Sequence, residues 1–164
     1  MHVHLSLGSN LGDRMANLRA AVAALKEMDA IQVTAVSNCY ETDPVGKVAQ
    51  PSFLNLAVEI ETDLEPLELL DTLQELERRL GREPSGRWGS RSIDLDIELW
   101  GARQVASERL TIPHQEFRRR AFVLAPLAEI APGAVDPLSG KTVAELAQSP
   151  DAVGRVVQIG PLDH

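Results

Sequence analysis

The sequence predicts an α+β protein of the ferredoxin-like sandwich type, with helices packed on a mostly antiparallel sheet. Three observations predict this class. Alternation of apolar and polar residues marks several strands, whereas two longer stretches repeat their apolar residues at helical spacing. These segments follow one another in the order β-α-β-β-α-β, with short connections. Such an order places both helices on one face of the sheet and leaves the other face for a ligand.

The first part of the chain contains a strand, a helix and a second strand. Apolar residues alternate over residues 2–7, which predicts the first strand. Residues 13–28 repeat apolar residues with helical spacing. The turn between them lacks the Gly-Lys-Ser/Thr ending of a Walker motif, so we interpret it as a strand-to-helix connection. Residues 31–40 are predicted to form the second strand.

A third strand is predicted from Phe53 to Glu61, and its two faces differ. One face is aliphatic and suits the core. The other face places Phe53 beside Asn55, whose amide can donate and accept hydrogen bonds. That pair suits a planar heterocycle, although a core phenylalanine with a capping asparagine explains it at least as well. A leucine-rich helix follows, beginning near Pro66 and ending at Gly81.

The central strand is predicted over residues 93–99, where apolar residues alternate with three carboxylates, Asp94, Asp96 and Glu98. Successive carboxylates on one strand face lie roughly 6.5–7 Å apart and repel one another. A divalent cation offsets this repulsion, because carboxylate oxygens are the hard ligands that Mg²⁺ prefers. A solvated edge strand paired with its own arginines is the alternative interpretation.

Basic residues flank this strand on both sides. Arg87 and Arg91 precede it, and their planar guanidinium groups match phosphate oxygens. His114 is followed by the arginine run 118–120, which is either a phosphate-binding corner or a solvated basic surface. Carboxylates, a metal ion and arginines so close together in sequence indicate a polyphosphate site.

Length and composition predict a single domain over residues 1–164 with an ordinary globular core. A helical segment around 123–130, a short helix near 143–148 and an apolar segment at 156–159 complete it. No secretory signal pattern or 18-residue apolar stretch is present, and the single cysteine excludes an intramolecular disulfide. We therefore expect a cytoplasmic protein.

The formal net charge of −8 argues against nucleic acid or an anionic membrane as a partner. Most arginines nevertheless lie between Arg78 and Arg120. A local cationic pocket on an acidic protein fits a small anionic ligand.

Four segments together resemble the 6-hydroxymethyl-7,8-dihydropterin pyrophosphokinase family of the folate pathway, in the right order and over nearly the whole chain. The most diagnostic is the Arg-x-Gly-x-Arg-x-x-Asp-x-Asp segment beginning at Arg87. The others are Gly8-Ser9-Asn10-Leu11-Gly12-Asp13, Gln50-Pro51-Ser52-Phe53-Leu54-Asn55 and Ile112-Pro113-His114.

The resemblance implies pyrophosphoryl transfer from ATP to the hydroxymethyl oxygen of the pterin, with release of AMP and two Mg²⁺ ions bound by Asp94 and Asp96. We expect a monomer whose partners are these two small molecules. By the same matching, the catalytic residues would be Arg82, Arg91, Asp94 and Asp96. Contacts with ATP would involve Arg87, Trp88, Ile97, His114, Arg118 and Arg120. The pterin would be bound by Thr42, Asp43, Pro44, Val45, Phe53, Asn55 and Phe122, with the two phenylalanines enclosing its ring.

Three features depart from the family pattern. Glu98 stands where an aliphatic residue is usual, and it would either change metal affinity or face solvent beyond the site. Gln115 stands where an aromatic residue is often found, which puts nucleotide stacking there in doubt. The loop 83–86 lacks an additional basic residue that some members carry.

Other functions remain open at this stage. A different Mg²⁺ enzyme, such as a nucleotidyl transferase or phosphohydrolase, could use the same two aspartates without an aromatic clamp. A non-catalytic ligand-binding module would tolerate loss of Asp96. An RNA-binding sheet is disfavoured by the acidic charge and the aromatic content of 4%.

Overall fold

The computed structural model describes residues 2–42, 52–81 and 93–162. Within these ranges the elements, in chain order, are β1 (His2–Ser9), α1 (Arg14–Glu27), β2 (Ile31–Val36), β3 (Cys39–Thr42), β4 (Phe53–Thr62), α2 (Pro66–Gly81), β5 (Asp94–Trp100), β6 (Val105–Ala106), β7 (Thr111–Ile112), the 3₁₀ helix η1 (Phe117–Arg119), α3 (Ala121–Ile130), α4 (Val143–Ala147) and β8 (Val156–Gly160). No helix in the described ranges is both long and apolar enough to cross a membrane.

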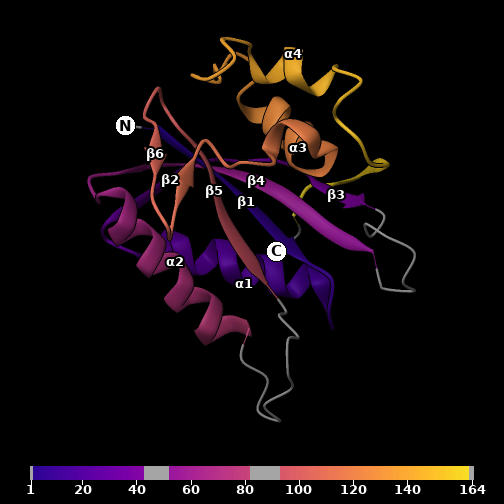
Figure 1. Cartoon of the computed structure of the whole chain (residues 1–164). Helices are drawn as coiled ribbons and strands as arrows, with labels where there is room; N and C mark the ends of the chain where they lie inside the picture. Colours follow the sequence, from indigo (N-terminus) through magenta and orange to yellow (C-terminus); the bar gives the residue numbers. More distant parts are fainter. Residues whose placement is uncertain (1, 43–51, 82–92, 163–164) are drawn as a thin grey trace.

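The main sheet has the strand order β5-β1-β4-β3-β8, and β2 pairs with β4 beyond the end of β3. Each of its strand pairs is antiparallel. Helices α1 and α2 pack on one face of the sheet, and α3 and α4 lie on the other (Figure 1). The arrangement confirms the predicted α+β class with a mostly antiparallel sheet, and the helices on the second face are additional to the predicted pair.

Each face of the sheet has its own apolar core. Under α1 and α2, alternate residues of the strands are fully buried, with Leu5 and Leu56 as examples. Under α3 and α4, the cluster contains Phe117 and Leu124 together with Ala57 from β4. The second cluster covers only part of its face, because the opposite end of that face is lined by polar residues of β1, β4 and β5.

The predicted strand over residues 31–40 is wrong at Ser37 and Asn38, where the structure has two strands. The Ser37 N–H donates to the Ala57 carbonyl at 2.9 Å, and the Ala57 N–H donates to Ser37 Oγ at 2.8 Å. A side-chain oxygen thus replaces a backbone acceptor, which interrupts the regular ladder. The Asn38 N–H donates to the Glu129 carboxylate instead of to a strand.

The predicted alternation along the central strand is also wrong, at its end. Leu5 pairs with Ile97 and His4 pairs with Leu99, so Glu98 is an extra residue in β5. Such a bulge reverses the inward and outward alternation beyond it. Leu99 consequently joins the core under α3, whereas the prediction placed it with Ile97 under α1 and α2.

Candidate active site

The floor of the site is formed by two rows of residues across β4, β1 and β5. In the first row, Gly8 pairs with Asn55 on one side and with Asp94 on the other. In the second row, Ser6 pairs with Ala57 and with Asp96. Directly paired residues share one face of a sheet, so the two aspartates and the asparagine face the same space. That face is the one opposite α1 and α2.

A cavity of about 560 Å³ lies over this floor. Its walls come from β3, β4, η1, the start of α3 and the segment before β8. The described lining residues are Ser6, Gly8, Thr42, Phe53, Asn55, Asp94, Asp96, Glu116, Arg119, Arg120, Phe122 and Val153. The cavity therefore combines two aromatic rings, an amide, three carboxylates and two guanidinium groups.

The Asn55 amide is oriented by its neighbours. Thr42 Oγ1 donates to Asn55 Oδ1 at 3.0 Å, and both residues are buried. Asn55 Nδ2 lies beside Gly8, at 2.7 Å from the position that a Cβ atom on residue 8 would take. No real Cβ contact is that short, so glycine at position 8 makes room for the amide. The assigned amide orientation follows from the hydrogen bond that Thr42 donates.

A second cavity, of about 390 Å³, lies on the other side of Asp96. It runs between α2, β5 and the connection from β6 to His114. The described lining residues are Leu70, Gln74, Leu95, Asp96, Ile97, Ser107, Glu108, Arg109, Leu110, Thr111, His114 and Gln115. Asp96 is shared by the two cavities, so ligands bound in them would meet at its carboxylate.

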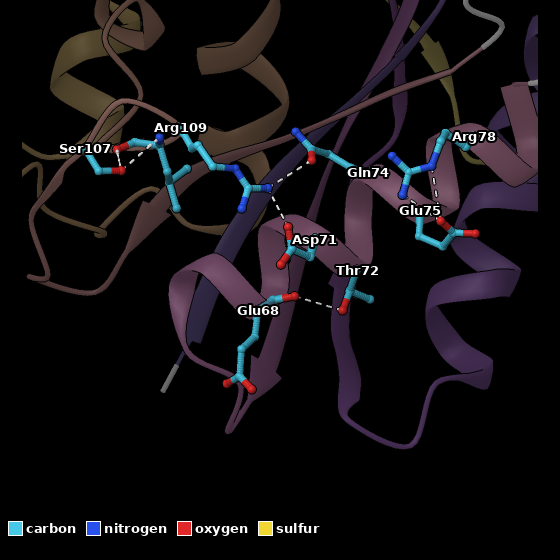
Figure 2. Close-up of polar contacts among 9 residues, drawn as sticks. Glu68, Asp71, Thr72, Gln74, Glu75, Arg78, Ser107 and Arg109 are labelled. Carbon is cyan, nitrogen blue, oxygen red and sulfur yellow. Dashed lines mark hydrogen bonds and ion pairs between the residues drawn. The ribbon is translucent and has the colours of Figure 1, made fainter.

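One wall of the second cavity is fastened to α2 by Arg109. Figure 2 shows its guanidinium directed at α2, where Nη2 donates to Asp71 Oδ1 at 2.5 Å and to Gln74 Oε1 at 3.3 Å. The turn that carries Arg109 is closed by Ser107, whose N–H donates to the Leu110 carbonyl at 2.9 Å. Residues far apart in sequence are thereby held across the cavity.

Glu98 follows Asp96 by two residues on β5, and it is 1% exposed. Burial, reinforced by the negative charge of Asp96, raises the pKa of Glu98 to about 8 although Arg120 opposes the shift. The His114 N–H donates to the Glu98 carbonyl at 3.0 Å, which fixes His114 next to β5. Burial and the nearby Arg120 lower the pKa of His114, against the attraction of Asp96 and Glu116.

The three arginines at positions 118–120 do not share one role. Arg118 donates through Nε and Nη2 to the Asp136 carboxylate at 2.5 and 2.8 Å, and Asp136 is fully buried. Arg119 and Arg120 line the first cavity instead. The Arg120 guanidinium lies 5.6 Å from the centre of the Phe122 ring, within cation–π range. The run is therefore neither a purely solvated surface nor a purely phosphate-binding corner.

Most described residues of the predicted site come together. Thr42, Phe53, Asn55, Asp94, Asp96, Arg120 and Phe122 line the first cavity, and Asp96, Ile97 and His114 line the second. Arg118 is absent from both linings, and its ion pair with Asp136 gives it a structural partner. The remaining predicted residues lie outside the described ranges: Asp43, Pro44, Val45, Arg82, Arg87, Trp88 and Arg91.

Sequence reasoning missed several lining residues. Ser6 and Gly8 alternate with the apolar residues of the first strand, and that alternation was the available signal for their place on the floor. Arg119 was part of a recognised basic run but was not singled out. Glu116 and Arg109 carried no distinguishing signal, because neither belongs to a motif or to a periodic pattern.

The geometry supports a specific kind of chemistry. Two carboxylates on neighbouring rows supply hard oxygen donors for a divalent cation. Guanidinium groups nearby can neutralise phosphate oxygens, and the aromatic rings with the oriented amide suit a flat polar heterocycle. Together the two cavities suit a reaction between a phosphorylated ligand and a heterocyclic one.

Comparisons with known proteins agree with this chemistry. A model of the family described as 7,8-dihydro-6-hydroxymethylpterin-pyrophosphokinase (HPPK) matches residues 4–132. A 2-amino-4-hydroxy-6-hydroxymethyldihydropteridine pyrophosphokinase of Bacillus subtilis is 53% identical over 127 residues, covering 77% of this chain and 76% of the relative. A protein of the same name from Methylorubrum extorquens is 46% identical over 151 residues, covering 92% of this chain and 94% of the relative.

Solved structures give a similar fold at low sequence identity. A triple mutant of Plasmodium falciparum HPPK-DHPS matches with a TM-score of 0.71 and 16% identity. The match covers 89% of this chain but only 43% of that longer chain. At this identity the likeness concerns the fold alone, and these neighbours carry the ferredoxin-like arrangement described above.

Proposed function

Because the chain belongs to the 7,8-dihydro-6-hydroxymethylpterin-pyrophosphokinase family, we propose that it is a pyrophosphokinase of folate biosynthesis. The reaction transfers the β- and γ-phosphoryl groups of ATP, as one unit, to the hydroxymethyl oxygen of 6-hydroxymethyl-7,8-dihydropterin. AMP is the leaving product.

The observation that carries the proposal is the position of Asp96 between two cavities. One cavity has the aromatic rings and amide that suit a pterin, and the other lies along α2 and the β6–β7 connection, where ATP would bind. Placing two reactants against one carboxylate brings the attacking oxygen and the phosphorus together, which supplies much of the acceleration in phosphoryl transfer.

In the first cavity, Phe53 and Phe122 would lie on the two faces of the pterin, where stacking on a flat ring is favourable. Asn55 would read the edge of the heterocycle through its N–H₂ group, because its carbonyl oxygen already accepts from Thr42. Asp43, Pro44 and Val45 would contribute to the same recognition, on the basis of the family resemblance alone.

Asp94 and Asp96 would hold two Mg²⁺ ions with ATP. The residues fit, because both carboxylates lie on one face of the sheet, and Asp96 is exposed to the cavities. Bound Mg²⁺ would neutralise phosphate oxygens and lower the pKa of a coordinated hydroxyl. By coordinating the ions, Asp94 and Asp96 would hold the positive charge beside the phosphate groups.

Cationic side chains would complete the phosphate environment. Arg119 and Arg120 line the cavity at the side of Phe122, where their guanidinium groups can contact oxygens of the transferred group. Ile97 and His114 would contact ATP from the second cavity. Arg82, Arg87, Trp88 and Arg91 are proposed to act on ATP from the resemblance, with Arg82 and Arg91 as catalytic residues.

We also propose that residues 1–164 form a single domain that acts as a monomer in the cytoplasm, where ATP is supplied. The main sheet joins the first five strands, β1 to β5, with the last strand, β8, which supports one folding unit. The acidic net charge favours small-molecule substrates over nucleic acid.

A product assay tests the function. Purified protein is incubated with Mg²⁺ and ATP, with and without the pterin, and the nucleotide products are separated. The proposal expects AMP only when the pterin is present. ADP as the product, or turnover independent of the pterin, would support a different Mg²⁺ enzyme on this fold. Bound ATP without turnover would support a non-catalytic module.

A further inference from the structure

The carboxylate of Glu98 is buried without a hydrogen-bonding partner. The residue is 1% exposed, and within the described part of the chain neither Oε1 nor Oε2 has a partner. Buried carboxylates in folded proteins are almost always hydrogen-bonded, paired or bound to a metal ion, because removing a carboxylate from water is costly. The orphaned oxygens therefore indicate that a ligand belongs next to them.

Two further ligand-type side chains surround those oxygens. Ligand atoms of Asp96, Glu98 and His114 all lie within 4.8 Å of one another. Ligands of an ion with ~2.1 Å bonds lie ~3.0–4.2 Å apart, so small side-chain rotations suffice to bring the three atoms around one ion. Within the described ranges this is the one group of three or more such residues with that spacing.

The backbone builds this arrangement. Glu98 is the extra residue of the bulge in β5, opposite the step from His4 to Leu5. The His114 N–H donates to the carbonyl of the same Glu98 at 3.0 Å, which holds the imidazole beside the bulge. A bulge next to a site commonly redirects a side chain toward it.

We propose that Asp96, Glu98 and His114 form a protein-only site for one divalent transition-metal ion, such as Co²⁺, Mn²⁺ or Zn²⁺, in the nucleotide-free protein. The donor set is one imidazole nitrogen and two carboxylate oxygens. Imidazole favours transition metals, whereas carboxylates and water alone suit Mg²⁺. The site thus differs in chemistry from the oxygen-only pair Asp94 and Asp96.

Binding changes one existing contact. His114 Nδ1 accepts from the Glu116 N–H at 3.2 Å, so in the neutral ring the proton resides on Nε2. Coordination through Nε2 would require that proton to move to Nδ1 and would end the contact with Glu116, whereas coordination through Nδ1 would replace that contact directly. Arg120 lies close enough to act on both Glu98 and His114 electrostatically, and its positive charge opposes the metal ion.

The test is a Co²⁺ titration of the nucleotide-free protein in excess Mg²⁺, followed by visible absorption. Mg²⁺ competes for the carboxylate oxygens, including those of the shared Asp96, so Co²⁺ that still binds is held by a site with a nitrogen ligand. The d–d bands of Co²⁺ report its ligands. We expect one equivalent of Co²⁺ to bind in the wild type. In Glu98→Gln and Glu98→Leu the affinity is expected to fall about tenfold or more. Circular dichroism and thermal unfolding verify that each variant is folded.

Asp94→Asn is the matched control, since Asp94 lies outside the three-residue site. It is expected to keep Co²⁺ binding within about twofold, while the proposed pyrophosphokinase reaction, if correct, is lost. Equal affinity in the wild type and Glu98→Gln overturns the site, as does loss of binding in Asp94→Asn with binding kept in Glu98→Gln. Absence of pterin-dependent AMP formation with intact Co²⁺ binding overturns the proposed function instead.

Discussion

Gly8 and Asn55 are direct neighbours across β1 and β4, and a Cβ atom on residue 8 would lie 2.7 Å from Asn55 Nδ2. The absence of a side chain on β1 therefore decides where the Asn55 amide lies. On its other side Gly8 pairs with Asp94, so a position without a side chain separates the Asn55 amide from the Asp94 carboxylate. The floor of the first cavity is therefore recessed at Gly8, between the asparagine and the aspartate.

Substitution Gly8→Ala is expected to raise KM for the pterin by about tenfold, which corresponds to ~1.4 kcal/mol, the scale of one hydrogen bond. The added methyl group displaces the Asn55 amide from its position under the heterocycle. Steady-state kinetics with each substrate varied in turn would measure the effect, and KM for ATP should change much less.

Gly133→Ala is the matched control, because a Cβ atom at residue 133 meets nothing within 4 Å and its φ is not positive. It should leave both KM values unchanged. An unaltered KM for the pterin in Gly8→Ala would show that Asn55 does not read the substrate.

Asp96→Asn removes one negative charge at the junction of the two cavities. We expect kcat/KM to fall about 100-fold or more. The isosteric amide is neutral and binds Mg²⁺ more weakly, so less positive charge is held beside the phosphate oxygens during the transfer. The rate of AMP formation at several Mg²⁺ concentrations would measure this. Asp29→Asn, on an exposed turn, is the charge-matched control. Near-normal turnover of Asp96→Asn at low Mg²⁺ would contradict the metal assignment.

Asp71→Ala frees the Arg109 guanidinium from α2. Both partners are about half exposed, so the ion pair contributes less than ~1 kcal/mol to stability. We nevertheless expect KM for ATP to rise severalfold at unchanged Tm, since Arg109 forms a wall of the second cavity. Glu75→Ala is the control, because its pair with Arg78 on the same helix lies outside that cavity's lining (Figure 2). Equal ATP kinetics in the two variants would argue against this cavity as the nucleotide site.

Asp136 anchors the segment that carries the arginine run. Burial disfavours its charge, but hydrogen bonds from Arg118, Ser139 and the Leu138 N–H outweigh that effect and lower the pKa of Asp136 to about 2. A lowered folded-state pKa contributes stability above the unfolded-state pKa, and this contribution is lost as pH falls from about 4 to 2. Asp136→Asn should therefore lose about 2 kcal/mol at pH 7.

Urea unfolding of the wild type and Asp136→Asn across this pH range provides the test. The difference in unfolding free energy should shrink toward zero as pH approaches 2. A difference that stays constant between pH 7 and pH 2 would mean that the carboxylate charge is not the stabilising element.

The fold was predictable where burial alternates cleanly. Along β4, Leu56 and Ile60 face α1 and α2 as the pattern indicated, and α2 runs from Pro66 to Gly81 between its predicted signals. The bulge at Glu98 was not predictable, because the sequence keeps alternating between apolar and acidic residues there. Only the pairing with β1, which skips Glu98, reveals the extra residue. The break at Ser37 arises because the Ser37 hydroxyl, instead of a backbone carbonyl, accepts the hydrogen bond from the Ala57 N–H. The strand propensity of residues 31–40 does not reveal this contact.

The site was predictable in part, for a similar reason. Asp94, Asp96, Phe53 and Asn55 carry their signal within single strands, so local alternation identified their shared face. Contacts between distant segments had no such signal. The partner of Arg118 is Asp136, eighteen residues away, and it removes that arginine from the cavities.

The central claim is the transfer of two phosphoryl groups as one unit, and the fate of labelled phosphorus tests it most directly. The protein would be incubated with the pterin and ATP labelled with ³²P at the β position, and separately at the γ position. We predict that both labels appear in the pterin product and that neither remains with AMP. Transfer of the γ label alone, with the β label retained in ADP, would contradict the account.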